Sequence, residues 1–265
     1  MNCRPVISIV IPVYHEGATI NHLIAHLRML DRRGECEIIV VDGHRDRDTI
    51  TAIRDPDVIG MGSARGRGRQ MNAGAAVARG SILLFLHADT YLPPDGLAGI
   101  TSVMKDARLV GGAFDLSFDS PRAGIRLLAR VDSLRARLSR IPFGDQAIFL
   151  RRDYFKQIGG FARIPIMEDV EIMRRIKRRR DPIAFLAARV TTSARRLLHE
   201  GLVYCVARGG AFLLLFYLGV SPFRLKRVYK DGFRPRRAGV PHPPRRAGET
   251  PCHAGLAAGD ERQAG

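Results

Sequence analysis

Three short apolar runs of this chain each end in polar residues, and this repeated change constrains the fold more than any other feature. The runs are residues 6–13, 37–41 and 82–86, and the polar residues that follow them are 14–16, Asp42 and 87–89. Apolar runs of this length are typical of strands buried on both faces of a parallel sheet. Since parallel strands end at one edge, where open α/β sheets bind ligands, we expect these polar residues to lie together.

Helical patterns alternate with these strands. Ile20, Leu23, Ile24, Leu27 and Leu30 recur at helical spacing, residues 70–79 are alanine-rich, and a weaker strand is indicated near residues 58–59. Strands that alternate with helices predict an α/β fold with a mostly parallel central sheet and flanking helices.

After Pro93 and Pro94 the pattern changes. Phe114, Leu116 and Phe118 alternate as in a half-buried strand, and residues 147–150 and 168–177 indicate a further strand and helix. A longer amphipathic helix is marked by Leu127, Val131, Leu134 and Leu138. The apolar stripe of such a helix ordinarily faces the core. We interpret the first half of the chain as the nucleotide half and residues 110–190 as the acceptor half.

The length and charge of the chain limit its organisation and its partners. With 265 residues we expect a catalytic domain over 1–200, a helical appendage over 201–233 and a disordered basic tail over 234–265. The net charge of +17 suggests anionic partners, namely nucleotide diphosphates, a phospholipid surface or nucleic acid. It does not choose among them, and an arginine-rich composition with a basic tail would produce the same charge.

Residues 202–220 are apolar but short. Their uninterrupted part, residues 209–220, has about 12 residues, whereas a bilayer span needs roughly 20. Basic residues flank the segment, among them Arg195, Arg196, Arg224 and Lys226. Two interpretations stay open, an interfacial helix held to anionic lipid and a helix packed on the catalytic domain.

The cysteine pattern bears on the compartment. Cys3, Cys36, Cys205 and Cys252 form no CxxC pair and lack the spacing of zinc ligands. The first apolar run is short and ends at Pro12, so we see no signal peptide. We expect a cytoplasmic, reduced location, with the inner face of the cytoplasmic membrane as a second candidate.

The segment Pro12-Val13-Tyr14-His15-Glu16 resembles the P-x-Y/F-N/H-E motif that opens the family 2 glycosyltransferases. Those enzymes have the GT-A fold and use a nucleotide-sugar donor. The resemblance implies that Pro12 ends the first strand, that Tyr14 lies near the base and that Glu16 accepts a hydrogen bond from base or ribose. It assigns Asp42 to the nucleobase N–H, a contact that suits uracil and guanine. Asp46 is expected to cap the next helix rather than to contact the ligand.

A glycine- and arginine-rich loop, residues 63–74, leads into the alanine-rich helix. Glycines allow the backbone to approach phosphate, and a helix amino terminus favours anions. Arg69, Gln70 and Asn72 lie closest to the family pattern for donor binding. Arg195 and Arg196 follow the sheet and are expected to close over the diphosphate.

The segment His87-Ala88-Asp89 corresponds to the family's D-x-D motif, with His87 in place of the first aspartate. That motif holds Mn²⁺ or Mg²⁺ on the diphosphate. The resemblance therefore makes Asp89 the metal ligand. His87 is a second candidate ligand, with ribose contact and simple packing as its alternatives.

The segment Met167-Glu168-Asp169 resembles the E-D motif that supplies the base in the inverting members. The resemblance assigns the base to Asp169 and its positioning to Glu168, while capping of a helix would explain the same two acids. Gly144, Asp145 and Gln146 match the segment beneath donor sugar and acceptor, where they would contact sugar hydroxyls.

In detail the chain resembles the radical-SAM/selenodomain-associated, or arsenosugar biosynthesis, subgroup of bacterial family 2 glycosyltransferases. We expect single transfer from a UDP- or GDP-linked donor to an unidentified acceptor hydroxyl, because the Q-x-x-R-W motif of processive synthases is missing from the sequence. An anionic membrane surface is a further candidate partner, and nucleic acid is disfavoured. The alternatives are a sugar-phosphate nucleotidyltransferase and a non-catalytic anion- or membrane-binding protein on the same fold.

Overall fold

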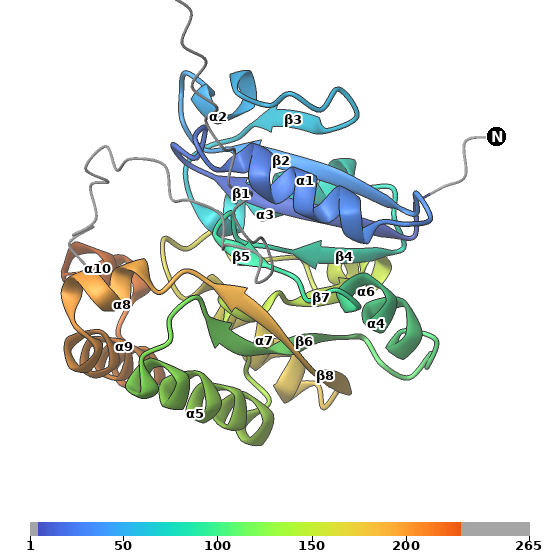
Figure 1. The fold of residues 1–265 in the computed structure, drawn as a ribbon. Coiled ribbons are helices and arrows are strands. Elements are labelled where there is room, and N and C mark those ends of the chain that lie inside the picture. Colours follow the sequence, from blue (N-terminus) through green and yellow to red (C-terminus); the bar gives the residue numbers. More distant parts are fainter. Residues whose placement is uncertain (1–4, 229–265) are drawn as a thin grey trace, which may run out of the picture. The chain divides into compact units, whose positions relative to one another are not determined.

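The computed structural model describes residues 5–228, in which an eight-stranded sheet has the order β3-β2-β1-β4-β7-β6-β8-β5 (Figure 1). The strands are β1 Ile7–Val13, β2 Cys36–Asp42, β3 Ile59–Gly62, β4 Ile82–Phe85, β5 Thr90–Tyr91, β6 Gly111–Phe118, β7 Phe149–Arg151 and β8 Ile183–Thr192.

Only β5 and β7 oppose the common strand direction. Strands β1 to β4 pair in parallel, β7 is antiparallel to both β4 and β6, and β8 is parallel to β6. Strands β1, β2, β4, β6 and β8 therefore all end at one edge, which we call the carboxyl edge. The mostly parallel α/β sheet expected from the sequence is confirmed.

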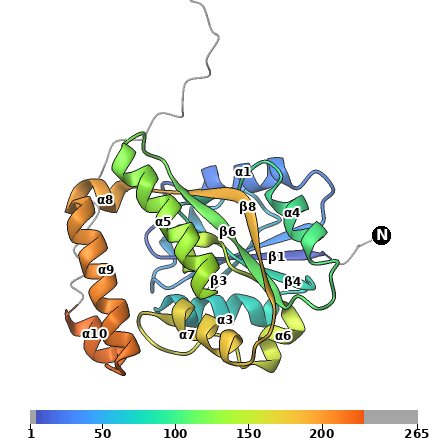
Figure 2. The ribbon, with the colours of Figure 1, turned by 90° about the horizontal axis from the view of Figure 1, so that it is seen from below.

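Helices cover both faces of the sheet (Figure 2). They are α1 Ile20–Leu30, α2 Asp48–Thr51, α3 Arg67–Val77, α4 Gly96–Val103, α5 Ala123–Ser139, α6 Arg152–Gln157, α7 Glu168–Arg178, α8 Arg195–Glu200, α9 Leu202–Tyr217 and α10 Pro222–Val228, with a 3₁₀ turn η1 at Gly144–Gln146. Apolar residues of α1 and α4 pack with Ile9 and Ile11 on one face, and those of α3, α6 and α7 pack with Val10 on the other. Alternate residues of β1 thus belong to two cores, which explains its uninterrupted apolar sequence.

The end of β1 differs from expectation by one residue. Pro12 does not end the strand, because β1 continues to Val13, which pairs with Asp42. The pairing of β1 with β4 ends at Val10. Beyond that point β1 has a neighbour on one side only, so the missing N–H of Pro12 breaks no ladder on the other side.

The apolar stripe predicted on α5 faces away from the domain, contrary to the usual orientation. The residues of α5 that are buried are Ile125, Ala129, Ser133 and Ala136. Leu127 is 60% exposed and Leu138 77% exposed. The Ser133 hydroxyl accepts a hydrogen bond from the Leu116 N–H at 2.9 Å, which fixes the small-residue face of α5 against β6. The helix is therefore apolar on its outer side as well.

Residues 201–228 belong to the same compact unit as the sheet, so the boundary expected at residue 200 lies inside that unit. Helix α9 is attached through Phe212 and Phe216, its two buried residues, and the Arg174 guanidinium of α7 lies 5.2 Å from the centre of the Phe216 ring. Within residues 5–228, no helix has the length and apolarity required to cross a bilayer. The expected tail, 234–265, lies outside the described residues.

Candidate active site

The carboxyl edge gathers most of the residues that the sequence singled out. In chain order they are Tyr14 and Glu16 after β1, Asp42 at the end of β2, His87 and Asp89 after β4, and Arg195 and Arg196 after β8. Burial raises the pKa of Glu16, and the Asp89 carboxylate adds to this effect, whereas Thr19 and Arg195 oppose it. Glu16, Asp89 and Arg195 come from the ends of three strands and therefore lie close enough to interact.

Tyr14 is presented as an aromatic face at this edge. Its side chain is 37% exposed, and the Arg65 guanidinium lies 4.2 Å from the centre of its ring. The rings of His15 and His44 meet it edge-on, with centroids 4.6 and 5.4 Å away. Arginine and tyrosine together offer the stacking and the positive charge that suit a nucleotide.

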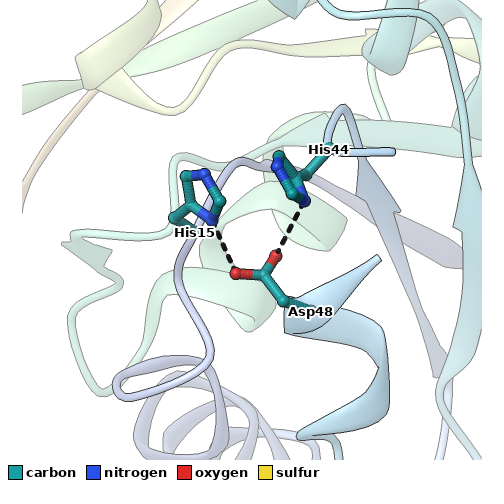
Figure 3. A group of neighbouring side chains, drawn as sticks. All are labelled: His15, His44 and Asp48. Atoms are coloured by element: carbon teal, nitrogen blue, oxygen red, sulfur yellow. Dashed lines mark hydrogen bonds and ion pairs between the residues drawn. The ribbon is translucent and has the colours of Figure 1, made fainter. Parts of the chain in front are cut away.

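His15, His44 and Asp48 form a cluster that the sequence analysis missed (Figure 3). His15 Nδ1 lies 2.6 Å from one carboxylate oxygen of Asp48 and His44 Nδ1 lies 3.8 Å from the other. Burial acts to raise the pKa of Asp48, but the hydrogen bond and charge of His15, the Thr49 N–H and the charge of His44 together outweigh burial, and the pKa lies below its usual value. Two imidazoles and a carboxylate could hold a transition metal. In this conformation they form ion pairs that hold the loops after β1 and β2 together.

Asp42 organises the loop after β2 through hydrogen bonds to the loop backbone. Its side chain is 0% exposed, and its two oxygens accept hydrogen bonds from the backbone N–H groups of His44 at 2.8 Å and Thr49 at 3.1 Å. Asp42 and Asp48, rather than Asp46, therefore accept from the first turn of α2, and the capping expected of Asp46 is wrong. The base contact expected of Asp42 stays a prediction.

Gln70 is a clamp between strands. It is 3% exposed, and its amide group donates to the carbonyls of Val13 at 2.7 Å and Val41 at 2.8 Å. Its amide oxygen accepts from the Gly66 N–H at 3.3 Å. Both amide hydrogens are thus used by the protein, so Gln70 sets the spacing of β1 and β2 instead of reaching a donor in this conformation.

The other two predicted residues of this loop differ in exposure. Asn72 exchanges two hydrogen bonds with the backbone of Phe161, at 2.8 and 2.9 Å, and so connects α3 to the Gly159-Gly160-Phe161 turn. Arg69 is exposed at the start of α3, as a residue that meets a diphosphate would be.

Asp89 and His87 fit a divalent cation. The Asp89 side chain is exposed, and the one hydrogen bond described for its carboxylate comes from Thr90 at the long distance of 3.5 Å. Burial, strengthened by Arg67, lowers the pKa of His87 to about 3, so its imidazole is neutral at pH 7. Neutral imidazole and carboxylate are both metal ligands, and this mixed set suits Mn²⁺ better than Mg²⁺, which prefers oxygen alone.

The expected base lies at the amino terminus of α7. Asp169 is half-buried; one of its oxygens accepts from the Gly144 N–H at 2.7 Å and the other from the Val170 N–H at 2.8 Å. A Cβ atom on Gly144 would lie 3.0 Å from His87 Nε2 and 3.3 Å from Asp169 Oδ2. Gly144 therefore lies between Asp169 and His87, and a side chain there would crowd both.

Glu168 lies behind Asp169 and is only 2% exposed. One of its oxygens lies 2.7 Å from Arg67 Nε, and the other is buried without a hydrogen-bond partner among the described residues. Burial raises the pKa of Glu168 despite Arg67, and the charge of Asp169 acts in the same direction. The sequence analysis selected Arg69 from this loop and gave Arg67 no role, whereas the structure pairs Arg67 with Glu168.

Residues 144–146 divide between site and scaffold. Burial raises the pKa of Asp145 to about 7, the charges of Asp132 and Asp169 add to this effect, and its Oδ1 has no partner among the described residues. Gln146 is completely buried; its amide donates to the Phe114 carbonyl at 3.0 Å and accepts from the Phe143 N–H at 3.1 Å. Gly144 and Asp145 thus stay candidates for sugar contact, whereas Gln146 fixes η1 to β6 in this conformation.

The arginines of α8 close the site from the end of β8. The Ala194 N–H donates to the Asp119 carboxylate at 2.5 Å, which ties the start of α8 to the end of β6. Arg195 then lies near enough to Glu16, and Arg196 to His87, to affect their pKa values. Both side chains are exposed at the edge where a diphosphate would bind.

Three loops that border the site pass through a left-handed backbone conformation with residues other than glycine. They are His15 at φ 60°, Ala147 at φ 48° and Met167 at φ 65°. Each such residue costs roughly 1 kcal/mol or more. They directly precede Glu16, Ile148 and Glu168 in the chain.

Comparison with known structures supports the fold. A mannosyltransferase of Pyrobaculum calidifontis, PcManGT, solved with GDP-Man and Mn²⁺, is similar with a TM-score of 0.56 and 21% identity over 72% of this chain and 57% of that one. S. aureus TarS (1-349) is similar with a TM-score of 0.55 and 16% identity over 73% of this chain and 62% of that one. TarS has also been solved with UDP and with UDP-GlcNAc.

Sequence comparison identifies the family. A protein of Mycobacterium tuberculosis (strain CDC 1551 / Oshkosh), "Uncharacterized protein MT1568", is 35% identical over 117 residues, which are 42% of this chain and 36% of that protein. The chain thus matches little more than a third of the length of that relative. The family model "Glycosyl transferase family 2" matches residues 8–162, which are more than half of the chain and run from the second residue of β1 to beyond β7. The chain therefore belongs to glycosyltransferase family 2.

Proposed function

We propose that this protein transfers a sugar from a nucleotide-diphosphate donor to an acceptor hydroxyl by a single, inverting displacement with the help of a divalent metal. The observation that carries the proposal is the placement of Asp169 against Gly144, across which lies His87, two residues from the exposed Asp89. The proposed base and the proposed diphosphate site would thus meet at one edge of the sheet, as direct displacement requires.

In the proposed reaction the acceptor oxygen attacks the anomeric carbon, and its proton passes to the Asp169 carboxylate. The bond between the anomeric carbon and the diphosphate oxygen breaks, and its electron pair leaves with the nucleoside diphosphate. Because the attack comes from the face opposite the leaving group, the configuration inverts. The backbone N–H of Gly144 holds the carboxylate in place before the acceptor arrives.

We propose that Glu168, which is buried, positions the base together with Arg67, whose side chain is 49% exposed. Arg67 is at the start of α3 and Glu168 at the start of α7. Their contact of 2.7 Å therefore joins α3, which follows the glycine- and arginine-rich loop, to α7, which carries Asp169. We propose that this contact transmits the position of the donor phosphates to Asp169.

Asp89, with His87, would hold Mn²⁺ or Mg²⁺, and that ion would neutralise charge on the departing diphosphate. Arg195 and Arg196 would add positive charge from the opposite side, and Arg69 would meet the phosphates from α3. Asp145 would contact a sugar hydroxyl, and in its protonated form it could donate a hydrogen bond.

The donor is proposed to be a UDP- or GDP-sugar. Tyr14 and Arg65 provide the surface for the base, with Asp42 contacting the N–H that uracil and guanine share. Neighbours of the fold are solved with GDP-Man, UDP and UDP-GlcNAc, which supports both nucleotides equally. Assignment to the arsenosugar subgroup, and a bacterial origin, stay predictions.

We also propose that the protein works at the inner face of the cytoplasmic membrane, where α9 and the basic residues around it would contact anionic lipid. The support for this location is the exposure of α9, of which only Phe212 and Phe216 are buried.

The test is calorimetric titration with UDP and GDP, each with and without Mn²⁺, for the wild type and Asp89→Ala. The matched control is Asp153→Ala, which removes an aspartate whose side chain is 92% exposed on α6. We expect Mn²⁺-dependent binding of one nucleotide that is lost in Asp89→Ala and kept in the control. Folded protein that binds neither nucleotide would overturn the proposal.

A further inference from the structure

The exposed apolar side chains of this protein gather on four helices. Among the described residues, fourteen of the seventeen large exposed hydrophobic side chains lie on α5, α8, α9 and α10 or at position 218 between the last two. Soluble surfaces carry such residues singly and rarely in a continuous patch. The concentration therefore indicates a surface that is covered when the protein works.

Helices α5 and α9 lie side by side in both ribbon views (Figures 1 and 2). A Cβ atom on Gly124 would lie 3.0 Å from the side chain of Leu202, which places the starts of the two helices in contact. Leu127, Val131, Leu134 and Leu138 form the outer stripe of α5, directly opposite its buried face. We call the outer stripe of α5 and the exposed apolar side chains of α9 together the apolar face.

The one charged residue of α9 is turned away from the apolar face. Arg208 lies 2.5 Å from Glu200, and the two side chains are 17% and 12% exposed. Because Arg208 is paired with Glu200, the outer side of α9 presents no charge over its whole length. A surface that contacted only water or nucleic acid would gain nothing from this arrangement, whereas a hydrocarbon layer would exclude any unpaired charge.

A basic hollow opens beside the apolar face. It has a volume of about 420 Å³ and lies between the end of α7 and the end of α9, where it is lined by Ile141, Arg174, Lys177, Arg178, Arg180 and Tyr217. The Arg174 guanidinium lies 4.7 Å from the centre of the Tyr217 ring. Among the described residues, no carboxylate forms an ion pair with any of these four cations.

We propose that the hollow binds the phosphodiester headgroup of an anionic phospholipid while the apolar face enters the adjoining acyl layer. Four unneutralised cations match a phosphate anion, and arginine offers it paired N–H donors. Tyr217 stands at the boundary, where an aromatic ring with a polar tip is favoured. The inference rests on the membrane location proposed above, and it names the lipid, the hollow and the second helix, α5, that make the contact.

The arrangement also orients the enzyme. The arrows of the parallel strands in Figure 1, such as β4 and β6, point toward the side of the sheet where α8, α9 and α10 lie. Glu168 and Asp169 begin α7, and Arg174, Lys177 and Arg178 are near its end. One helix therefore connects the proposed base with the proposed lipid site.

The experiment is co-sedimentation of the full chain with vesicles of phosphatidylcholine, with and without phosphatidylglycerol. One variant, Lys177→Glu/Arg178→Glu, alters the hollow, and another, Leu134→Asp/Leu138→Asp, alters the outer stripe of α5. Their controls are Arg32→Glu/Arg33→Glu, with the same charge change, and Met29→Asp on α1, whose side chain is 70% exposed.

We expect binding that requires phosphatidylglycerol and weakens at least about tenfold in each test variant, since each basic residue near the surface contributes about 1 kcal/mol. The controls should bind like the wild type. Equal binding of pure phosphatidylcholine, or test variants indistinguishable from the controls, would overturn the inference. So would competition by duplex DNA that removes the protein from vesicles, or a dimer in sedimentation that only the stripe variant dissociates.

Nucleotide titration of the same samples separates this inference from the proposed catalysis. A test variant that leaves the vesicles yet still binds UDP or GDP shows that it is folded and that the lipid site has been removed. Wild-type protein that binds nucleotide but no vesicle refutes the lipid site and leaves the glycosyltransferase proposal standing. Vesicle binding without nucleotide binding has the reverse meaning.

Discussion

Two buried glutamates at opposite ends of the sheet have opposite environments. Glu37, near the start of β2, is 6% exposed and accepts four hydrogen bonds, from the Ser8 hydroxyl, the Arg79 N–H and guanidinium, and the Gly80 N–H. Burial alone would raise the pKa of Glu37, but these bonds outweigh it and the pKa lies below its usual value.

Glu168, at the carboxyl edge, is buried as deeply but is half satisfied. One oxygen meets Arg67, the other has no partner among the described residues, and the pKa of Glu168 is raised by burial. Native proteins leave few buried polar atoms unpaired, and those they do leave are concentrated where function needs them. The comparison indicates that Glu37, at the amino edge of the sheet where the parallel strands begin, stabilises the fold. Glu168, at the carboxyl edge, is left partly unsatisfied beside the candidate site.

The largest expected effect is the loss of activity on replacing Asp169, the proposed base next to Glu168. Asp169→Asn removes the proposed base and should lower kcat by about a thousandfold, or roughly 4 kcal/mol. Asparagine has one acceptor oxygen instead of two, so it can accept the bond from the Gly144 N–H but not also the one from the Val170 N–H, and the melting temperature should fall only slightly. Steady-state kinetics and calorimetry measure both quantities, with Asp153→Asn as the control. A variant with normal kcat would end the assignment of Asp169 as base.

Next in size is the loss of the well-satisfied glutamate. Glu37→Gln cannot accept all four bonds and replaces a buried charge, so the free energy of unfolding should fall by about 3 kcal/mol. Activity per folded molecule should not change, because the amino edge is remote from the site. Denaturant unfolding measures the effect against Glu35→Gln, a neighbouring side chain that is 41% exposed. Equal stability of the two variants would contradict the contrast drawn between the edges.

Glu168→Gln should have the opposite effect to Glu37→Gln, lowering activity with little change in stability. Removing a partly unsatisfied buried carboxylate should leave the free energy of unfolding within about 1 kcal/mol of wild type, while kcat falls roughly tenfold because Asp169 is positioned less well. Because the pKa of Glu168 is raised in the folded state, the folded protein keeps a proton that the unfolded chain releases as the pH rises through 4.5. The free energy of unfolding of wild type therefore falls as the pH rises above that value. The variant should therefore gain on wild type as the pH rises. A large stability loss at neutral pH would mean that Glu168 is structural.

The smallest effect concerns Asp145, whose pKa is raised to about 7 from 3.8. Between these two values the folded protein holds a proton that the unfolded chain has released, so wild-type stability declines as pH rises from about 4 to about 7. Asp145→Asn should remove this slope and be more stable than wild type at pH 8. Thermal unfolding at several pH values checks this; parallel curves for the two proteins would refute it.

The sequence predicted the elements and the edge that carries the site, because apolar runs and helical spacing report burial directly. Asp89, Asp169 and Tyr14 all lie at that edge, as expected. Periodicity does not report which side of a helix faces the core when both sides are apolar, so the outward stripe of α5 was missed. Serine and alanine formed its buried face, and they carry a weak signal.

The sequence also could not predict which polar side chains the scaffold itself uses. Gln70 was expected to touch the donor, yet its amide bonds to Val13, which is 57 residues away in the chain. Gln146 is similarly bonded to Phe114, 32 residues away. Such bonds depend on contacts between distant segments, and a motif gives the residue type but not its partner. Arg67 was missed for the same reason.

The three left-handed residues at the edge of the site have a further meaning for how this enzyme can change over evolutionary time. Glycine would adopt the conformations of His15, Ala147 and Met167 at less cost, so drift toward thermal robustness would tend to replace them. Each such replacement would turn a stiff corner into a hinge beside Glu16 or Glu168. Retaining side chains there keeps these corners stiffer than glycine would, at the cost of the left-handed conformation.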